Sequence, residues 1–235
     1  MDTVLRIRPT SGHVVHDGRS FATADIDLGG VPRGAVLIIC EPAALSATSD
    51  EVGNRFAEHG YESTTADIAA VLGDGDDAIV GAVGALLRHV GRRDWETDQI
   101  AVVAYGASAR AALLAAVVLP IGAAVSATAN LDDLAPGADS GWAASAPWLG
   151  LVATGEHRPG AIDGFRVATE EASSAYTEVV AYPHVAGVSL HHSREPVEHA
   201  AAFDSWQRTL EWLNLRVVPR PTPLALAWQS RCSQR

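Results

Sequence analysis

The chain has 235 residues, 48% of them hydrophobic, which suffices for one domain that needs no disulfide or metal to fold. Its net charge is −11, with 28 acidic residues against 17 basic ones, and this argues against nucleic acid as a partner because phosphate binding needs a clustered positive surface. All basic residues are arginine, so chemistry that needs a lysine amine is excluded.

No segment indicates export or insertion into a membrane. The first residues (MDTVLRIRPTSG) lack a basic region followed by an apolar run, and no stretch reaches about 18 apolar residues. The two cysteines, Cys40 and Cys232, form no metal-binding or disulfide pattern. We therefore expect a soluble cytoplasmic protein without a membrane partner, cofactor or metal.

Strands alternate with helices along the chain, which predicts a mainly parallel sheet with helices on both faces. The continuous apolar run at 35–40 is typical of a strand buried on both sides. A helix is expected over 46–59, with Thr48 or Ser49 as its N-cap. The expected strands are an antiparallel pair up to about residue 28, then 35–40, 61–65, 100–105, 123–127, 149–154 and 177–182. The expected helices are 46–59, 76–90, 107–119, 162–174 and 195–213.

The pattern predicts a single domain over 1–235 with no internal repeat. It divides into N-terminal antiparallel strands at 1–33, a core at 34–213 and an extended, proline-rich tail at 214–235. A loop between the strands at 123–127 and 149–154 carries Trp142 and Trp148, which are candidates to wall a ligand cleft.

The segment IAVVAYGASARAALLAA, from Ile100, contains the first of three motifs that resemble the dienelactone hydrolase family. In that family a strand ends in a sharp turn that exposes a Cys or Ser nucleophile and points backbone N–H groups at the oxyanion. The nucleophile position is Gly106, which has no side chain to attack with. Glycine adopts the positive φ of such a turn freely, so the backbone geometry is expected to survive. An ordinary glycine-containing turn between strand and helix would give the same pattern.

The second motif is LVATGEHRP, from Leu151, which is similar to an apolar strand followed by Gly-Glu-x-Asp-Pro in the family. Gly155, Glu156 and Pro159 match, but the position of the acid that orients the catalytic histidine holds Arg158. A cation there would repel an imidazolium. Glu156 and Asp163 are alternative acids and are also ordinary surface residue types.

The third motif is VAYPHVAGV, from Val180, which resembles the family's Tyr-Pro-Gly-Ala-x-His-Gly-Phe. Gly187 stands at the position of the catalytic histidine, and His184 comes three residues too early. His191 and His192 are adjacent, so a metal site there would need a third ligand. The three motifs together imply an α/β-hydrolase fold, a three-layer sandwich around a mainly parallel sheet, in which all three triad positions are substituted: Gly106, Arg158 and Gly187.

One further position of the family is kept. The first core strand leads into Cys40-Glu41-Pro42, and relatives have a glutamate near the nucleophile at the place of Glu41. Glu41 is also an ordinary polar residue for a strand end. Pro42 has no N–H, so this residue has no donor to contribute to an oxyanion hole. The candidate cleft residues are Cys40, Glu41, Tyr105, Gly106, Ala107, Ser108 and His184.

Three functional hypotheses follow. The first is a pseudoenzyme that binds a small molecule or a protein in the old active-site cleft, where parallel sheets place ligands. The second is an esterase or lactone hydrolase rebuilt on Ser108 or Cys40, although such a serine usually caps or packs and such a thiol is usually inert. The third is a non-hydrolytic isomerase or cyclase that uses Glu41 or His184. The sequence is also compatible with a homo-oligomer.

Overall fold

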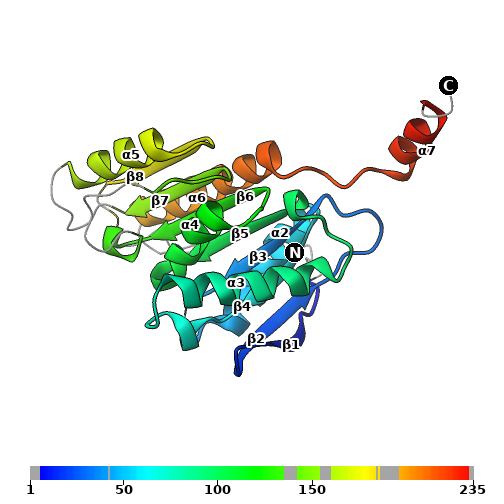
Figure 1. The fold of residues 1–235 in the computed structure, drawn as a ribbon, viewed down its shortest axis with the longest axis horizontal. Helices are drawn as coiled ribbons and strands as arrows, with labels where there is room; N and C mark the ends of the chain where they lie inside the picture. Colours follow the sequence, from blue (N-terminus) through cyan, green and yellow to red (C-terminus); the bar gives the residue numbers. More distant parts are fainter. Residues whose placement is uncertain are drawn as a thin grey trace.

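The computed structural model describes residues 6–41, 43–134, 142–153, 160–183, 185 and 196–232. Eight strands and seven α-helices alternate over this part of the chain (Figure 1). The strands are β1 (Thr10–His16), β2 (Arg19–Ile26), β3 (Gly34–Ile39), β4 (Tyr61–Ala66), β5 (Ile100–Tyr105), β6 (Ala123–Thr128), β7 (Trp148–Ala153) and β8 (Thr177–Tyr182). The helices are α1 (Leu45–Thr48), α2 (Asn54–Glu58), α3 (Asp76–Gly91), α4 (Ala109–Val118), α5 (Ala161–Ala172), α6 (Pro196–Arg216) and α7 (Pro223–Cys232).

All eight strands form one sheet in the order β1-β2-β4-β3-β5-β6-β7-β8. The β1–β2 hairpin and the β2–β4 pair are antiparallel, and every other pairing is parallel. Every residue of β3, β5, β6 and β7 is buried, which explains why these strands read as unbroken runs of apolar and small residues. The expected mainly parallel sheet is confirmed.

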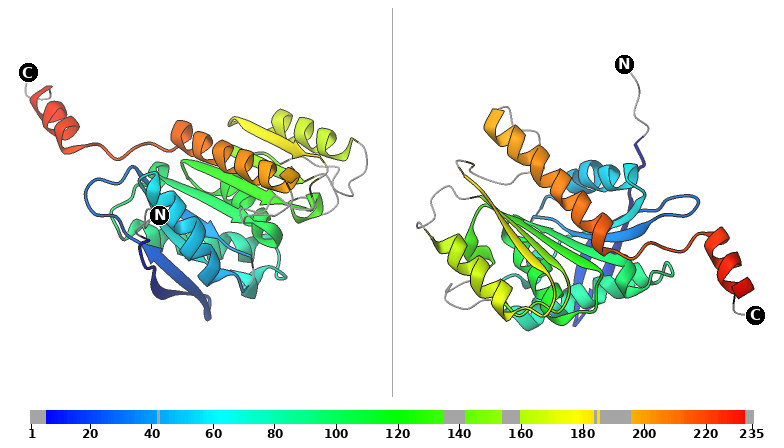
Figure 2. Two further views of the ribbon diagram at one scale, coloured as in Figure 1. Left: turned by 180° about the vertical axis from the view of Figure 1, so that it is seen from behind. Right: turned by 90° about the horizontal axis from the view of Figure 1, so that it is seen from above.

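Helices cover both faces of the sheet and complete three layers (Figure 2). Side chains of α3, α4 and α5 pack in one hydrophobic cluster, and those of α2 and α6 pack in the other, on the opposite face. α3 has the clearest pattern, with Ile79, Val83, Leu86 and Val90 buried at helical spacing and two aspartates in its first turn.

The first helical segment differs from its expected form. It runs from Leu45 to Glu58 as α1, a π-helical stretch at Ser49–Gly53, and α2. Neither expected N-cap is used: Thr48 and Ser49 lie inside the helix, and the Ser49 hydroxyl donates to the carbonyl of Ser46 at 3.0 Å. A serine or threonine is a cap only where the chain enters the helix, and that point lies earlier, at Ala44.

The C-terminal tail is only partly extended, which corrects the expectation for 214–235. α6 continues to Arg216, and α7 follows a short extended link. The Thr222 hydroxyl accepts from the N–H of Ala225 at 3.2 Å, and Pro223 occupies the first helical position, where its missing N–H is harmless. The prolines that suggested an extended tail therefore precede and begin a helix.

None of the helices in the described part of the chain is long and apolar enough to cross a membrane.

Candidate functional site

A tight turn joins β5 to α4 at the carboxyl edge of the sheet. Gly106 follows Tyr105 with a φ of 56°, and a 3₁₀ turn over Gly106–Ser108 leads into the helix. A non-glycine residue pays about 1–2 kcal/mol in this left-handed region. The turn thus has a residue of positive φ between strand and helix, at the position that the sequence motif indicates.

The side chain of Glu41 fills the space beside Gly106. A Cβ atom on residue 106 would overlap with Oε1 of Glu41 and would lie 2.7 Å from its Cδ atom and 2.8 Å from its Cγ atom. Real Cβ atoms do not approach other atoms so closely, so any side chain at position 106 requires Glu41 to move. Glu41 is exposed, and its carboxylate occupies the space that a side chain at position 106 would need.

The loop after β3 offers little to an oxyanion. Pro42 has no N–H, and the next two N–H groups already have acceptors. The N–H of Ala43 donates to the Asp67 carboxylate at 3.1 Å, and that of Ala44 donates to the carbonyl of Glu41 at 3.0 Å. Ala43 also has a positive φ of 63°, a conformation that residues other than glycine seldom adopt. The loop beside the turn at Gly106 therefore combines a proline with a strained alanine.

Ser108 and Cys40 lie side by side beneath the turn, and both are fully buried. The Ser108 hydroxyl donates to the carbonyl of Cys40 at 3.0 Å, and the Cys40 thiol lies 3.3 Å from the carbonyl oxygen of Ala66. Burial, with a smaller contribution from the Asp67 carboxylate, raises the pKa of the Cys40 thiol to about 12. Ser108 therefore links the turn to β3, and Cys40 is held as a neutral thiol.

This difference between the two cysteines gives a direct test. In the native protein we expect a thiol reagent such as Ellman's reagent to modify the exposed Cys232 rapidly and to leave Cys40 unmodified at pH 8. With a pKa near 12, only about one Cys40 thiol in 10,000 is ionised at that pH. Cys40 should react once the protein is unfolded in guanidinium. Two rapidly reacting thiols in the folded protein would contradict this placement, and Cys232→Ser assigns the fast phase.

Tyr105 adds a buried phenol at the same edge. It is 8% exposed, and its hydroxyl has no hydrogen-bond partner among the described residues. Burial raises the pKa of Tyr105, and the positive charge of Arg55 on α2 partly opposes this. Tyr105 is thus a neutral donor. Ala107, the residue after the turn glycine, is exposed.

Several other expected site residues fall outside the described residues, namely Glu156, Arg158, His184, Gly187, His191 and His192. Of the alternative acids only Asp163 is described, and it is an exposed residue of α5 that pairs with Arg166 in the same helix at 3.1 Å. Among the described residues, no three His, Cys, Asp or Glu side chains come together as metal ligands.

Trp148 does not wall a cleft, contrary to the expectation. It is the first residue of β7, at the amino edge of the sheet, and it is fully buried in the cluster under α3, α4 and α5. Its indole N–H donates to the Ser126 hydroxyl at 3.0 Å, and its ring meets Phe165 edge to face. The strand begins one residue earlier than expected, which draws Trp148 from the loop into the core.

Trp142 is half-buried and packs against the same cluster. The guanidinium of Arg110 lies 4.9 Å from the centre of its ring. Arg110 also makes two 2.8 Å hydrogen bonds to Asp76. This arginine therefore ties α4 to α3.

The comparisons with known proteins identify the fold. No model of a known protein family matches the sequence, and no curated protein matches it. A Klebsiella pneumoniae structure, named provisionally as a dienelactone hydrolase, superimposes with a TM-score of 0.66 at 18% identity, over 88% of this chain and 98% of that one. Native esterase 2 of Thermogutta terrifontis gives a TM-score of 0.64 at 14% identity, over 87% of this chain and 91% of that one.

A third similar structure is the acylaminoacyl peptidase of Pyrococcus horikoshii, with a TM-score of 0.66 at 8% identity, over 91% of this chain and 42% of that one. At these identities the likeness shows the fold alone. The chain has the α/β-hydrolase fold, and the expected fold class is confirmed.

Proposed function

We propose that this chain is a dienelactone-hydrolase-like protein that does not hydrolyse esters by the family's route and instead binds a small molecule at the carboxyl edge of its sheet. The observation that supports this most directly is the placement of Glu41. Position 106 has no reactive side chain, and the Glu41 carboxylate occupies the space that a nucleophile there would need.

The loss of turnover expected for an enzyme without its nucleophile favours binding over hydrolysis. In a comparable serine-protease triad, removing the nucleophile costs about a millionfold in turnover. The oxyanion hole would not compensate, because Ala43 and Ala44 already donate elsewhere. Ser108 and Cys40 offer no replacement nucleophile, since both are fully buried and engaged.

The residues of the site favour ligands of one chemical class. The Glu41 carboxylate is exposed and only accepts hydrogen bonds, whereas the Tyr105 hydroxyl is buried away from it. A neutral or cationic ligand with an N–H or O–H group fits Glu41, and an anionic ligand would be repelled by it. This differs from hydrolysis, in which negative charge develops on the substrate.

The experiment is an esterase and lactonase screen with a chromogenic acetate and a lactone, combined with labelling by an active-site-directed phosphonate. We expect no turnover above buffer and no labelling. The matched positive control is the variant Gly106→Cys, Arg158→Asp and Gly187→His in the background of Glu41→Ala, which should gain weak esterase activity because it restores the three family residues and clears the space beside position 106. Stoichiometric labelling of Ser108 or Cys40 in the unmodified protein would overturn the proposal in favour of a rebuilt hydrolase. A folded variant of this kind with no gain would contradict the placement of the motifs.

Native mass spectrometry of the purified protein provides the complementary test of binding. We expect a neutral or cationic small molecule to co-purify and to be lost in Glu41→Arg, in which the accepting carboxylate becomes a cation. Retention of the same molecule by this variant would contradict a ligand at Glu41. Conversion of the bound molecule during incubation would support the non-hydrolytic enzyme instead.

A further inference from the structure

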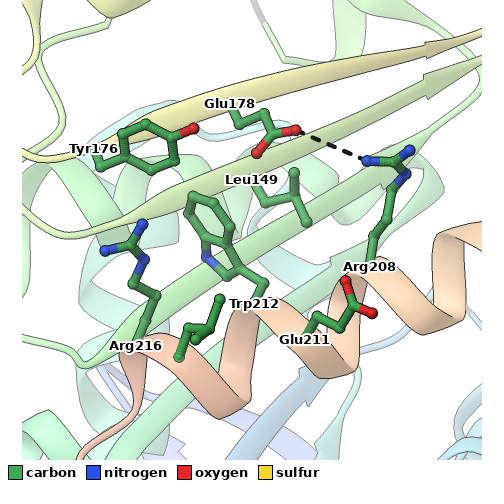
Figure 3. Close-up of a pocket in the computed structure, with 8 residues that line it drawn as sticks. Leu149, Tyr176, Glu178, Arg208, Glu211, Trp212 and Arg216 are labelled. Atoms are coloured by element: carbon green, nitrogen blue, oxygen red, sulfur yellow. Dashed lines mark ion pairs between the residues drawn. The ribbon is translucent and has the colours of Figure 1, made fainter.

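A small pocket opens between α6 and the outer strand β8, at the amino edge of the sheet. We call it the α6–β8 pocket, and Figure 3 shows it. Its charged lining consists of Glu178, Arg208, Glu211 and Arg216, and Tyr176 and Trp212 supply its aromatic rings. The rings of Tyr176 and Trp212 stack with their centres 5.6 Å apart, and the Arg216 guanidinium lies 4.8 Å from the first and 5.2 Å from the second. Leu215 is 77% exposed beside them.

The size of this pocket fits a side chain better than a metabolite. Its volume is about 190 Å³. Sites for small molecules usually measure about 300–1,000 Å³, whereas pockets that receive one large anchor residue are common at protein interfaces. Two buried polar atoms, Nε1 of Trp212 and Nε of Arg216, have no hydrogen-bond partner within the described ranges. The pocket therefore resembles the part of a protein–protein interface that receives a side chain of the partner.

α7 packs against none of the other helices and strands that the structure describes. It extends into solvent beyond the rest of the protein (Figures 1 and 2), and none of its described side chains is buried. Leu224 is 75% exposed and Trp228 is 64% exposed. They are four residues apart and share a helix face with Arg231, whose guanidinium lies 5.9 Å from the centre of the Trp228 ring. A helix of ten residues is marginal in water on its own, so this one needs a surface to pack against.

The path of the chain keeps α7 away from its own pocket. After α6, the N–H of Val218 donates to the carbonyl of Asp98 and that of Arg220 donates to the carbonyl of Arg33, each at 3.0 Å. The Arg220 guanidinium lies 3.6 Å from the centre of the Trp95 ring. These contacts lead the chain along the amino edge from β5 towards β3, whereas the pocket lies at β7 and β8 on the other side.

The two surfaces offer one pair of opposite charges, Arg231 of α7 and Glu211, in a pocket whose lining also contains Glu178, Arg208 and Arg216. Residues 217–235 contain three arginines and no acidic residue, in a chain whose net charge is −11. On the pocket, Glu211 forms no ion pair with any residue that the structure describes, and Glu178 lies 3.9 Å from Arg208. Arg231 is the one charged residue of α7, and Glu211 is a free carboxylate at the rim of the pocket.

We infer that α7 of one protomer packs into the α6–β8 pocket of a second copy of this chain, with Trp228 as the anchor and Arg231 paired with Glu211. The exchange is reciprocal, which closes a two-fold dimer and buries both helices. The inference is independent of the function proposed for the site at Glu41, because the pocket lies at the opposite edge of the sheet.

The first test measures molar mass by light scattering during size exclusion, at about 1–100 µM protein, where small interfaces associate. We expect the mass of two chains for the unmodified protein and of one chain for Trp228→Asp and for Leu215→Asp. The matched control is Leu226→Asp on the opposite face of α7, which should remain a dimer. A monomeric unmodified protein, or a Trp228→Asp variant that remains dimeric, would overturn the inference. All three substitutions are at exposed positions, and circular dichroism verifies the fold.

The second test exchanges the charges of the expected ion pair. Arg231→Glu and Glu211→Arg should each weaken dimerisation by about tenfold, since each replaces an attraction by a repulsion. The double variant should recover most of the affinity. A double variant no tighter than the single variants would show that α7 does not pack against this pocket.

Discussion

Replacing Trp148 by alanine is expected to lower the free energy of unfolding by about 3–5 kcal/mol, the range measured for fully buried aromatic residues. Trp148 is 0% exposed, packs edge to face against Phe165 and donates its indole N–H to Ser126. Gly150, which lies against the indole, has no side chain to fill the volume, and a Cβ there would lie 2.5 Å from the ring. Urea denaturation monitored by circular dichroism measures the loss.

Two milder substitutions separate packing from hydrogen bonding at this site. Trp148→Phe keeps an aromatic ring and should cost less than Trp148→Ala. Ser126→Ala leaves the indole N–H without its acceptor and should cost about 1–3 kcal/mol. A loss below about 1 kcal/mol for Trp148→Ala, far under the range for buried aromatics, would contradict its placement in the core.

Replacing Gly106 by alanine is expected to lower the free energy of unfolding by about 2–4 kcal/mol from two causes. The positive φ of 56° disfavours any residue with a Cβ, and the new methyl group overlaps with Glu41. In the background of Glu41→Ala the second cause disappears, and the loss should fall to about 1–2 kcal/mol. The double-mutant cycle thus measures the coupling between the two residues.

Gly18→Ala is the matched control for this cycle. Gly18 has a φ of 74° in the β1–β2 turn, and a Cβ there would meet nothing within 4 Å. Gly18→Ala should lower the free energy of unfolding by the same amount as Gly106→Ala does in the Glu41→Ala background. This amount should not change when Glu41 is replaced. Independent, additive effects of the substitutions at positions 41 and 106 would show that the carboxylate does not occupy the space beside the turn.

The parts of the fold that local pattern determines could be predicted from the sequence. β5 and β8 have the expected bounds, because a run of six strand-forming residues between breaking residues leaves little choice of end. The turn at Gly106 could also be predicted, since the glycine follows a buried strand directly and begins a helical pattern. These features depend on residues next to one another in the chain.

Features that depend on distant residues could not be predicted. Glu41 and Gly106 are brought together only by the pairing of β3 with β5, and which side chain fills the space of a missing one is decided by packing. The burial of the Trp148 side chain depends on Ser126 and Phe165, which belong to other elements. The role of Arg110 likewise depends on Asp76 of α3. α7 could not be predicted for another reason. The three nearby prolines indicate extended chain, and this indication outweighs the cap at Thr222 and the helix-forming residues after Pro223.

The contact between Glu41 and Gly106 has an evolutionary consequence. If an ancestor of this chain had a nucleophile on the β5–α4 turn, Glu41 now occupies part of the space that this side chain needed. A substitution that brings back cysteine or serine would therefore have to be accompanied by a movement or a replacement of Glu41. At least two coupled changes separate the present turn from a reactive one.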